Sequence, residues 1–174
     1  SVYLYSPLVE SLATSLYFQG RFDDALPLYH QAVEASPEDY EMWGNLGDAY
    51  RHASKNTDLA RPMYKNALKL AGNRLKINAN DAETLAMMAH YSASIGLRED
   101  ALEYIERADP LNSEDMVVQY SAANALCTLD ETERALDMLE RALILGYPRH
   151  MALADPNLQC LRDIPRFSTL IEQR

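Results

Sequence analysis

Small residues recur along this chain at a nearly fixed spacing, and this spacing restricts the fold more than any other feature of the sequence. In four successive segments, three small residues are separated by 12 or 13 positions and then by 7. Two antiparallel helices approach closely only where small side chains lie between them, so the spacing predicts four helical hairpins. The sets are Ala13, Ala25 and Ala32; Gly47, Ala60 and Ala67; Ala89, Ala101 and Ala108; and Ala123, Ala135 and Ala142.

Larger residues next to these positions are expected to fill the space between the helices. They are Leu12, Trp43, Leu46, Tyr50, Leu85 and Met88 on the first helices, and Tyr29, Tyr64, Ile105 and Leu139 on the second helices. The abundance of Ala, Leu, Glu and Met agrees with a helical fold.

Turn residues punctuate the predicted hairpins. Gly20 and Gly96 follow the first helix of their hairpins, where a left-handed residue commonly ends a helix. Asn56 and Asp130 stand at the equivalent places, and both residue types tolerate the left-handed conformation. Between hairpins, three doublets are expected to provide helix N-caps: Glu38-Asp39, Asn80-Asp81 and Glu114-Asp115.

These features resemble a known repeat family. The stretch WGNLGDAY (residues 43–50), followed by Ala60, Tyr64 and Ala67, resembles the tetratricopeptide repeat, a helix–turn–helix unit of about 34 residues. The stretch GRFDDALPLYHQAVEASPED (residues 20–39) matches the second half of that pattern. The resemblance implies an all-α, right-handed superhelical solenoid with hairpins at about 6–39, 40–81, 82–115 and 116–149. The fourth lacks both the turn glycine and the closing proline.

The two ends of the array are expected to differ. Asp155-Pro156 and Ile164-Pro165 suggest two helix starts, because proline is tolerated in a first helical turn. With the apolar residues between and after them, they predict capping helices over residues 150–174 that cover the last hairpin. Residues 1–5 are too few to form a cap. The N-terminal face is therefore expected to have been cut from a longer array or an upstream domain.

The second hairpin contains an insertion of seven residues. The distance from the second-helix alanine to the closing aspartate is 7 residues in the first and third hairpins, but 14 between Ala67 and Asp81. Seven residues turn a helix by about 700°, within about 20° of two full turns. The insertion therefore predicts a longer second helix with its phase preserved. Gly72-Asn73 would cost about 1 kcal/mol inside it, which leaves a bent helix and a broken helix both open.

Composition and motifs exclude several functions. A net charge of −10 argues against binding of bare nucleic acid, and no apolar run approaches the ~20 residues of a membrane span. The histidines and cysteines have no metal-ligand spacing, and no nucleophile or phosphate-loop motif is present. Cys127 and Cys160 suggest no disulfide framework, which points to a reducing, cytoplasmic compartment. We therefore expect no catalysis, cofactor or metal.

A binding surface is the more promising hypothesis. In stacked hairpins the first helices line the concave face, and an i, i+4, i+7 stripe points away from the packing positions. Its polar and aromatic side chains suit an extended peptide, although each alone could be ordinary exposed polarity. The predicted stripe comprises Glu10, Thr14, Tyr17, Asn45, Asp48, Arg51, Glu83, Met87, His90, Tyr120 and Asn124, with Cys127 at its end.

The family resemblance narrows the partner. Tetratricopeptide co-chaperones that bind acidic C-termini use Lys, Arg and Asn on this stripe. Here Asn45 fits one such position, but Glu10, Thr14, Glu83 and Met87 occupy others, and an acidic stripe binds a carboxylate poorly. The stretches WGNLGDAYR, KINANDAETLA and DPNLQCLRDIPRFSTL are similar to C-terminal repeat regions of bacterial multidomain signalling proteins. That likeness covers about residues 40–172 and implies a regulatory or scaffolding module.

Three hypotheses follow from the sequence. The first is a module that binds a peptide or partner domain on its concave face. The second is an architectural role, in which the N-terminal face or the long helix mediates self-association or docks onto an upstream domain. The third is an enzyme with an active site around Asp48, His90 and Tyr120, for which the sequence offers no motif.

Overall fold

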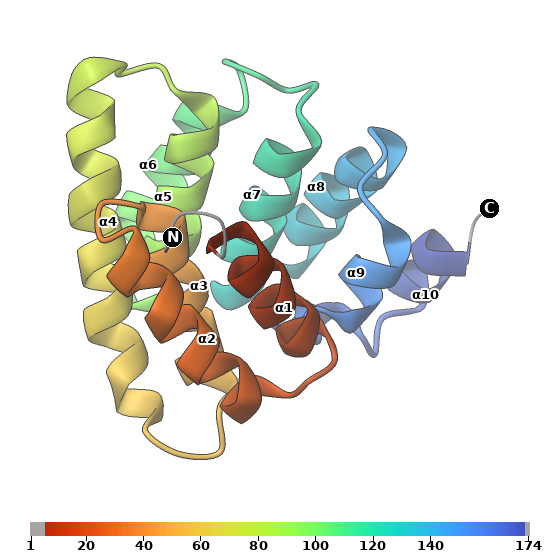
Figure 1. Cartoon of the computed structure of the whole chain (residues 1–174). Helices are drawn as coiled ribbons and strands as arrows, with labels where there is room; N and C mark the ends of the chain where they lie inside the picture. Colours follow the sequence, from red (N-terminus) through yellow and green to blue (C-terminus); the bar gives the residue numbers. More distant parts are fainter. Residues whose placement is uncertain (1–5, 173–174) are drawn as a thin grey trace. The chain divides into compact units, whose positions relative to one another are not determined.

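Helices account for all regular structure in the part of the chain that the structure describes, residues 6–172 (Figure 1). The computed structural model contains no β-strand within that range, which confirms the predicted all-α class. The chain folds as two compact units, residues 1–73 and residues 74–174. The segment predicted upstream of the repeats, residues 1–5, and the last two residues of the predicted cap lie outside the described range. The right-handed superhelical course concerns the whole array and stays a prediction.

The first unit consists of two helical hairpins. Its elements are α1 (Ser6–Phe18), α2 (Phe22–Ala35), α3 (Tyr40–His52), the short 3-10 helix η2 (Thr57–Leu59) and the larger part of α4 (Ala60–Ile77). Helix α2 packs against both α1 and α3. Helices α3 and α4 lie close together at Gly47, where an added Cβ would lie 2.8 Å from Cε1 of Tyr64. The glycine therefore makes room for the tyrosine ring.

The second unit contains two further hairpins and a C-terminal segment. Its elements after α4 are α5 (Ala82–Ser94), α6 (Arg98–Ala108), α7 (Met116–Thr128), α8 (Thr132–Ile144), α9 (Arg149–Ala154), the 3-10 helix η3 (Pro156–Leu161) and α10 (Pro165–Glu172). Helix α5 packs against α6 and α7, and α7 packs against α8. In both units, all twelve small positions of the repeat are buried, which confirms that they are packing sites.

The predicted turn and cap chemistry is confirmed. Asn56 and Asp130 have φ angles of 60° and 61°, and Gly20 and Gly96 have φ angles of 74° and 83°. In each predicted cap doublet, the aspartate is the residue that caps. The Asp39 carboxylate accepts from the amides of Glu41 and Met42, that of Asp81 from the amide of Thr84, and that of Asp115 from the amides of Val117 and Val118.

Most of the predicted core residues are buried, with one clear error. Leu46, Leu85, Leu139, Ile105, Tyr29 and Tyr64 are each at most 2% exposed. Leu12, however, is 53% exposed, so the prediction for this residue is wrong. The equivalent Leu46 is covered because α2 packs against α3, whereas no helix precedes α1 among the described residues.

The long helix α4 is continuous. It runs for 18 residues through Gly72 and Asn73, whereas α2, α6 and α8 have 14, 11 and 13 residues. The helix is therefore about two turns longer than α6, as predicted, but only about one turn longer than α2 and α8. The boundary between the two compact units falls inside it, between Asn73 and Arg74. Gly72 does not break the helix, but it lies next to this boundary.

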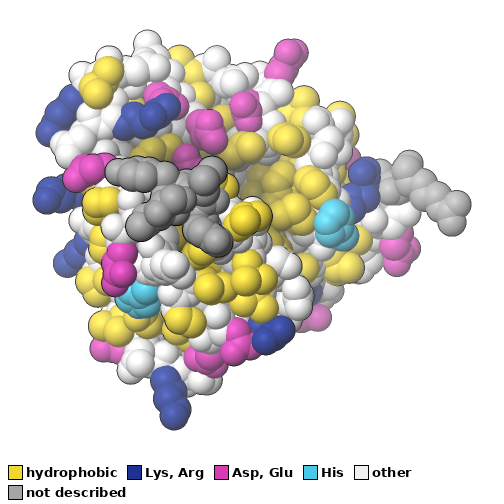
Figure 2. Space-filling model, viewed as in Figure 1, with side chains coloured by type: hydrophobic (Ala, Val, Ile, Leu, Met, Phe, Trp, Pro, Cys, Tyr) yellow, Lys and Arg dark blue, Asp and Glu magenta, His cyan; other side chains and the backbone are white. Residues whose placement is uncertain are grey.

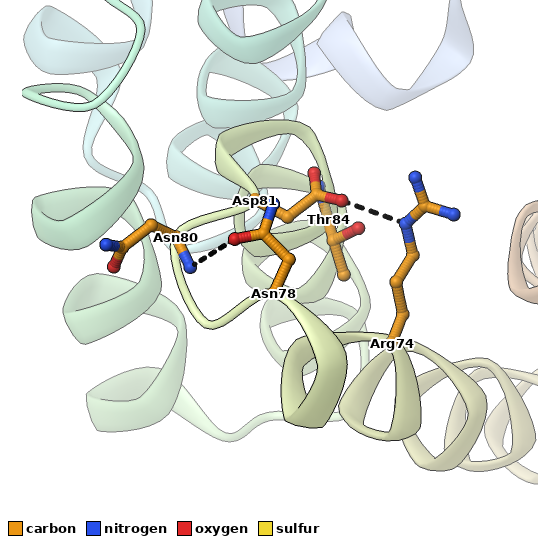
Figure 3. Close-up of polar contacts among 5 residues, drawn as sticks. All are labelled: Arg74, Asn78, Asn80, Asp81 and Thr84. Atoms are coloured by element: carbon orange, nitrogen blue, oxygen red, sulfur yellow. Dashed lines mark hydrogen bonds and ion pairs between the residues drawn. The ribbon is translucent and has the colours of Figure 1, made fainter.

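Polar contacts hold the end of α4 to the start of α5 (Figure 3). Arg74 Nε donates to Asp81 Oδ2 at 2.9 Å, and the Thr84 amide donates to Asp81 Oδ1 at 3.2 Å. Burial pushes the pKa of Asp81 up, but the hydrogen bonds from Thr84 and Arg74 outweigh it and hold that pKa below its ordinary value. The Asn80 amide donates to Asn78 Oδ1 at 3.2 Å and closes the turn.

The C-terminal segment packs onto the last hairpin. Pro156 begins η3 and Pro165 begins α10, which confirms both predicted helix starts. Helix η3 packs against α7 and α8, and α10 packs against α8 and α9. The segment shares one apolar core with α7 and α8, to which it contributes Leu158, Leu161, Phe167 and Leu170.

A disulfide joins this segment to α7, contrary to the sequence prediction. Cys127 in α7 and Cys160 in η3 are bonded, with their Cα atoms 5.7 Å apart. The two cysteines are 33 residues apart in the sequence, so no local motif indicated that they form a disulfide. The bond forms where η3 packs against α7. Disulfides persist mainly in oxidising environments. The inference of a reducing compartment from the cysteines therefore loses its basis.

Candidate functional site

Each first helix carries a polar residue directly after its small residue. These four residues are Thr14, Asp48, His90 and Asn124, and all belong to the predicted binding stripe. A buried polar side chain needs a hydrogen-bond partner. Thr14, Asp48 and Asn124 each have such a partner, and the two units supply it in different ways.

In the first unit, a tyrosine of the second helix provides the partner. Tyr29 Oη donates to Thr14 Oγ1 at 3.3 Å, and Tyr64 Oη donates to Asp48 Oδ1 at 2.6 Å. Burial, together with the Asp48 carboxylate, raises the pKa of Tyr29 to about 12. Its hydroxyl therefore remains a hydrogen-bond donor at neutral pH. Both tyrosines are at most 2% exposed, so they fix the stripe residues from the inner side of each hairpin.

The other stripe residues of the first unit divide into two kinds. Tyr17 is only 5% exposed, and its ring packs edge-on against Phe22 at 5.3 Å and lies 6.3 Å from that of His52. It therefore holds α1, α2 and α3 together. The remaining stripe residues of α1 and α3 are half-buried. We call four of them the α1/α3 surface: Glu10, Asn45, Asp48 and Arg51.

In the second unit the predicted stripe lies on α5 and α7, which pack against each other. Ser121 Oγ donates to Met87 Sδ at 3.3 Å and links the two helices. Glu83 is exposed and Met87 is half-buried. His90 is 4% exposed, with its ring centre 5.7 Å from that of Tyr91. Among these, only Glu83 and Met87 have accessible side chains.

Tyr120 and Asn124 are bound by the chain itself. Tyr120 Oη and Asn124 Nδ2 both donate to Asp155 Oδ2, the second at 3.2 Å. The Asn157 amide donates to the other carboxylate oxygen of Asp155 at 2.9 Å, so Asp155 also caps η3. All four residues are at most 8% exposed. While the C-terminal segment is in place, a partner cannot reach Tyr120 or Asn124.

The same contacts strongly favour the neutral form of Tyr120. Burial and the neighbouring Asp155 carboxylate raise the pKa of Tyr120 well above its ordinary value. Tyr147 stacks on it with ring centres 3.7 Å apart, and burial raises the pKa of Tyr147 as well. The two tyrosines are therefore neutral, and Tyr120 links α7 to the C-terminal segment through its hydrogen bond to Asp155.

Sequence reasoning missed the role of Asp155 in this cluster. The residue was recognised only as part of a helix start before Pro156. Asp155 caps η3 and also accepts hydrogen bonds from α7. The second role is visible only in the folded structure, where η3 packs against α7. The one available signal was the residue type: Tyr120 and Asn124 are donors on a helix otherwise rich in alanine and apolar residues, and such donors require an acceptor nearby.

Two residues of the hypothetical active site, Asp48 and Tyr120, have hydrogen-bond partners within the fold. Asp48 is hydrogen-bonded to Tyr64, and Tyr120 is hydrogen-bonded to Asp155. Across residues 6–172, no group of three or more His, Cys, Asp or Glu side chains could hold a metal ion. No helix in this range is long and apolar enough to cross a bilayer.

Helices paired through small residues, in tandem along the chain, define a helical-hairpin repeat protein. Residues 11–81, about two fifths of the chain, match the family model of the tetratricopeptide repeat. Proteins built from these repeats are generally protein–protein interaction modules, and the fold is typically non-catalytic. No curated protein matches the sequence.

Several solved structures are similar to the chain at low identity. A crystal structure of MamA has 17% identity and a TM-score of 0.46, and the match covers 95% of this chain and 89% of that chain. MamA from Desulfovibrio magneticus RS-1 has 15% identity and a TM-score of 0.44, with 96% and 93% covered. YrrB, described as a tetratricopeptide repeat protein with an unusual peptide-binding site, has 17% identity and a TM-score of 0.42, with 83% and 88% covered. Likenesses at this level carry no inference about a partner.

Proposed function

We propose that this chain is a non-catalytic protein–protein interaction module that binds a peptide or partner domain through its first helices, with the α1/α3 surface as the principal site. The observation that carries the proposal is a difference in accessibility between the stripe residues of the two units. Asp48 is held from behind by Tyr64 at 2.6 Å and its own side chain is half-buried, whereas Tyr120 and Asn124 are covered by the C-terminal segment.

The chemistry of the α1/α3 surface suits an extended peptide. Asn45 can both donate to and accept from a peptide backbone, and side chains already fixed by packing lose less conformational entropy on binding. Glu10 and Asp48 carry negative charge and Arg51 carries positive charge. This mixture favours a neutral or basic segment over a free C-terminal carboxylate. A regulatory or scaffolding role within a larger protein is what the sequence resemblance of residues 40–172 implies, and it stays a prediction.

Peptide selection tests this proposal directly. Twelve-residue peptides selected from a random library on the whole chain would be measured by fluorescence anisotropy against wild type and the Asn45→Ala/Arg51→Ala double variant. We expect the double variant to lose at least tenfold in affinity, since two central side-chain contacts are removed. The matched control is Gln31→Ala/Glu34→Ala, two exposed positions on α2. If both double variants bind the selected peptides equally well, the α1/α3 surface is not the site.

A second candidate function has one observation in its favour. Leu8 and Leu12 on α1 are 67% and 53% exposed, and adjacent exposed leucines favour contact with another apolar surface. An architectural role, in which α1 packs on another copy or on an upstream domain, would cover them. Light scattering across concentration tests self-association, with Leu8→Ser/Leu12→Ser as the comparison. A wild-type chain that stays monomeric at high concentration would eliminate self-association and leave docking to another domain.

A further inference from the structure

Positive charge is concentrated in one short part of this acidic chain. All four lysines lie between residues 55 and 76, and residues 59–80 contain five Lys or Arg and no Asp or Glu. The other 152 residues contain the remaining 11 basic residues and all 26 acidic ones. Because this basic segment contains α4, the longest helix, the charge is displayed along a helix rather than a loop.

Three of these cations form a row on the outer side of α4. Arg61, Lys65 and Lys69 are spaced i, i+4 and i+8, so they lie within about 80° of one another around the helix and span about 12 Å. All three are exposed, while Ala67 on the opposite side is 0% exposed. We call these three residues the α4 basic row. Lys and Arg side chains gather along the left edge of Figure 2, where α4 lies in Figure 1.

The two lysines of the row are not used in the fold. Several arginines of the chain form ion pairs, such as Arg21 with Asp24 at 2.7 Å and Arg141 with Asp109 at 3.5 Å. Lys65 and Lys69 form neither an ion pair nor a hydrogen bond with any residue that the structure describes. Arg61 has a contact of its own, so the inference depends on the lysines. Two unneutralised cations one helical turn apart form a point of local positive potential.

The chain itself shows how a helix can satisfy such cations. Arg166 in α10 contacts Glu133, Asp137 and Glu140 on α8, at 3.7, 2.8 and 2.5 Å. These carboxylates are spaced i, i+4 and i+7 along one face of α8. In this protein, a row of carboxylates at helical spacing on α8 therefore binds the basic side chain of Arg166. The same spacing, about 6 Å per four residues, matches the step of the α4 basic row.

We propose that the α4 basic row is a second docking surface, which binds an acidic α-helix of a partner protein whose carboxylates repeat at i, i+4 and i+8. Duplex DNA fits less well, because the row is a single line of cations on a chain of net charge −10. A second copy of this chain also fits less well. Its α8 row is occupied by Arg166, Glu103 on α6 contacts Arg107 at 3.5 Å, and two copies of this charge repel each other. The surface is on a second helix, so it is separate from the α1/α3 surface.

A pair of synthetic helices tests the proposal. The probe is a fluorescent, alanine-based 18-residue peptide with glutamates at i, i+4, i+8 and i+12. Its isomer has the same composition, with the glutamates distributed evenly around the helix. Both would be titrated with the whole chain at 50 and 300 mM salt. We expect the row peptide to bind at least fivefold more tightly than the isomer at low salt, and this preference to shrink at high salt because the charges are exposed.

Two matched variants locate the binding site. Lys65→Ala/Lys69→Ala should weaken binding of the row peptide by about 5- to 10-fold, since two exposed ion pairs of modest strength are lost. Lys55→Ala/Arg134→Ala removes the same charge from two exposed positions outside the row and should change binding less than twofold. Circular dichroism confirms that both variants remain folded, which is expected for exposed sites.

Four results would overturn the proposal. The first is equal binding of the row peptide and its isomer, and the second is an equal effect of the two double variants. The third is tighter binding of a 20-base-pair DNA duplex or of phosphatidylserine vesicles, lost in Lys65→Ala/Lys69→Ala, which would assign the row to another class of ligand. The fourth is self-association that the same variant abolishes, which would make a second copy the occupant. None of these results bears on the α1/α3 surface, so the two proposals fail independently.

Discussion

The two compact units of this chain treat the same repeat position in opposite ways. In the first unit, the polar residue after each small residue is held by a tyrosine of its own hairpin, as Asp48 is held by Tyr64. In the second unit, the corresponding second-helix residues are Ile105 and Leu139, which cannot donate, and Asn124 is held by Asp155 of the C-terminal segment instead. The position of the hydrogen-bond partner decides whether the residue is accessible. Tyr64 is buried inside the hairpin and leaves Asp48 partly exposed, whereas Asp155 belongs to a segment that covers Asn124.

This difference also clarifies what a C-terminal cap does. The segment contributes Leu158, Leu161 and Phe167 to the core of the last hairpin, and apolar cover is the usual reason for a cap. It also brings a buried acceptor to two buried donors. A cap made only of apolar residues would leave Tyr120 and Asn124 unpaired, at a cost of about 1–3 kcal/mol for each buried group. The C-terminal segment therefore caps the last hairpin by hydrogen bonding as well as by apolar packing.

The largest expected effect comes from removing the acceptor in the second unit. Asp155→Ala should lower the free energy of unfolding by about 3 kcal/mol, because the hydroxyl of Tyr120 and the amide of Asn124 lose their acceptor in a buried site and η3 loses its N-cap. Urea unfolding followed by circular dichroism measures the change. Asp163→Ala, at an exposed position, should stay within about 0.5 kcal/mol of wild type. Equal midpoints for the two variants would mean that the cluster contributes nothing to stability.

The next effect concerns the close approach in the first unit. Gly47→Ala places a Cβ 2.8 Å from the buried ring of Tyr64, and overpacking of this kind costs about 2 kcal/mol. The single tryptophan, Trp43, lies in α3, so its fluorescence in urea reports on this unit. Gly72→Ala is the matched control. No atom lies within 4 Å of a Cβ at that position, and alanine should stabilise the helix by up to about 1 kcal/mol.

Local chemistry is what the sequence predicted well. Small packing residues, left-handed turn residues and aspartate N-caps each depend on neighbours within one hairpin, so their spacing is visible along the chain. Asn56 and Asp130 illustrate this point: both were expected from their positions alone to be left-handed, and their φ angles are 60° and 61°.

Long-range docking is what the sequence did not reveal. The Cys127–Cys160 bond and the acceptor role of Asp155 both exist only because η3 lies against α7, with partners 31 to 35 residues away in the sequence. The exposure of Leu12 has the same origin, because it depends on which helix stands beside α1. The binding stripe was predicted from exposure on an ideal first helix. It was therefore least informative where another segment covers that helix.

A smaller effect tests whether the tyrosines of the first unit differ as their acceptors do. Tyr64 donates to a carboxylate at 2.6 Å, whereas Tyr29 donates to a neutral hydroxyl at 3.3 Å. Hydrogen bonds to charged groups are the stronger class. Tyr64→Phe should therefore cost about 1.5 kcal/mol and Tyr29→Phe about 0.5 kcal/mol, measured by Trp43 fluorescence in urea. If Asp48→Asn reduces the cost of Tyr64→Phe to that of Tyr29→Phe, the charge explains the difference. An equal cost for both tyrosines in the wild-type background would contradict it.

The smallest effect concerns the two aspartates that cap α3 and α5. Asp39 caps through the amides of Glu41 and Met42, whereas Asp81 also binds Arg74 at 2.9 Å. The Arg74 side chain is 60% exposed, so Arg74→Ala should cost only about 0.5 kcal/mol at pH 7.

The pH dependence identifies the cause of this effect. The folded-state pKa of Asp81 is depressed, so the contribution of Asp81 to the free energy of unfolding is complete above its unfolded pKa, about 3.9, and is lost as the pH falls through the folded pKa. The urea midpoints of wild type and Arg74→Ala should therefore differ at pH 7 and converge at pH 2. A difference that persists at pH 2 would show that Arg74 stabilises the junction by packing rather than through Asp81. Lys69→Ala, which removes an exposed cation from the same helix, should show no such pH dependence.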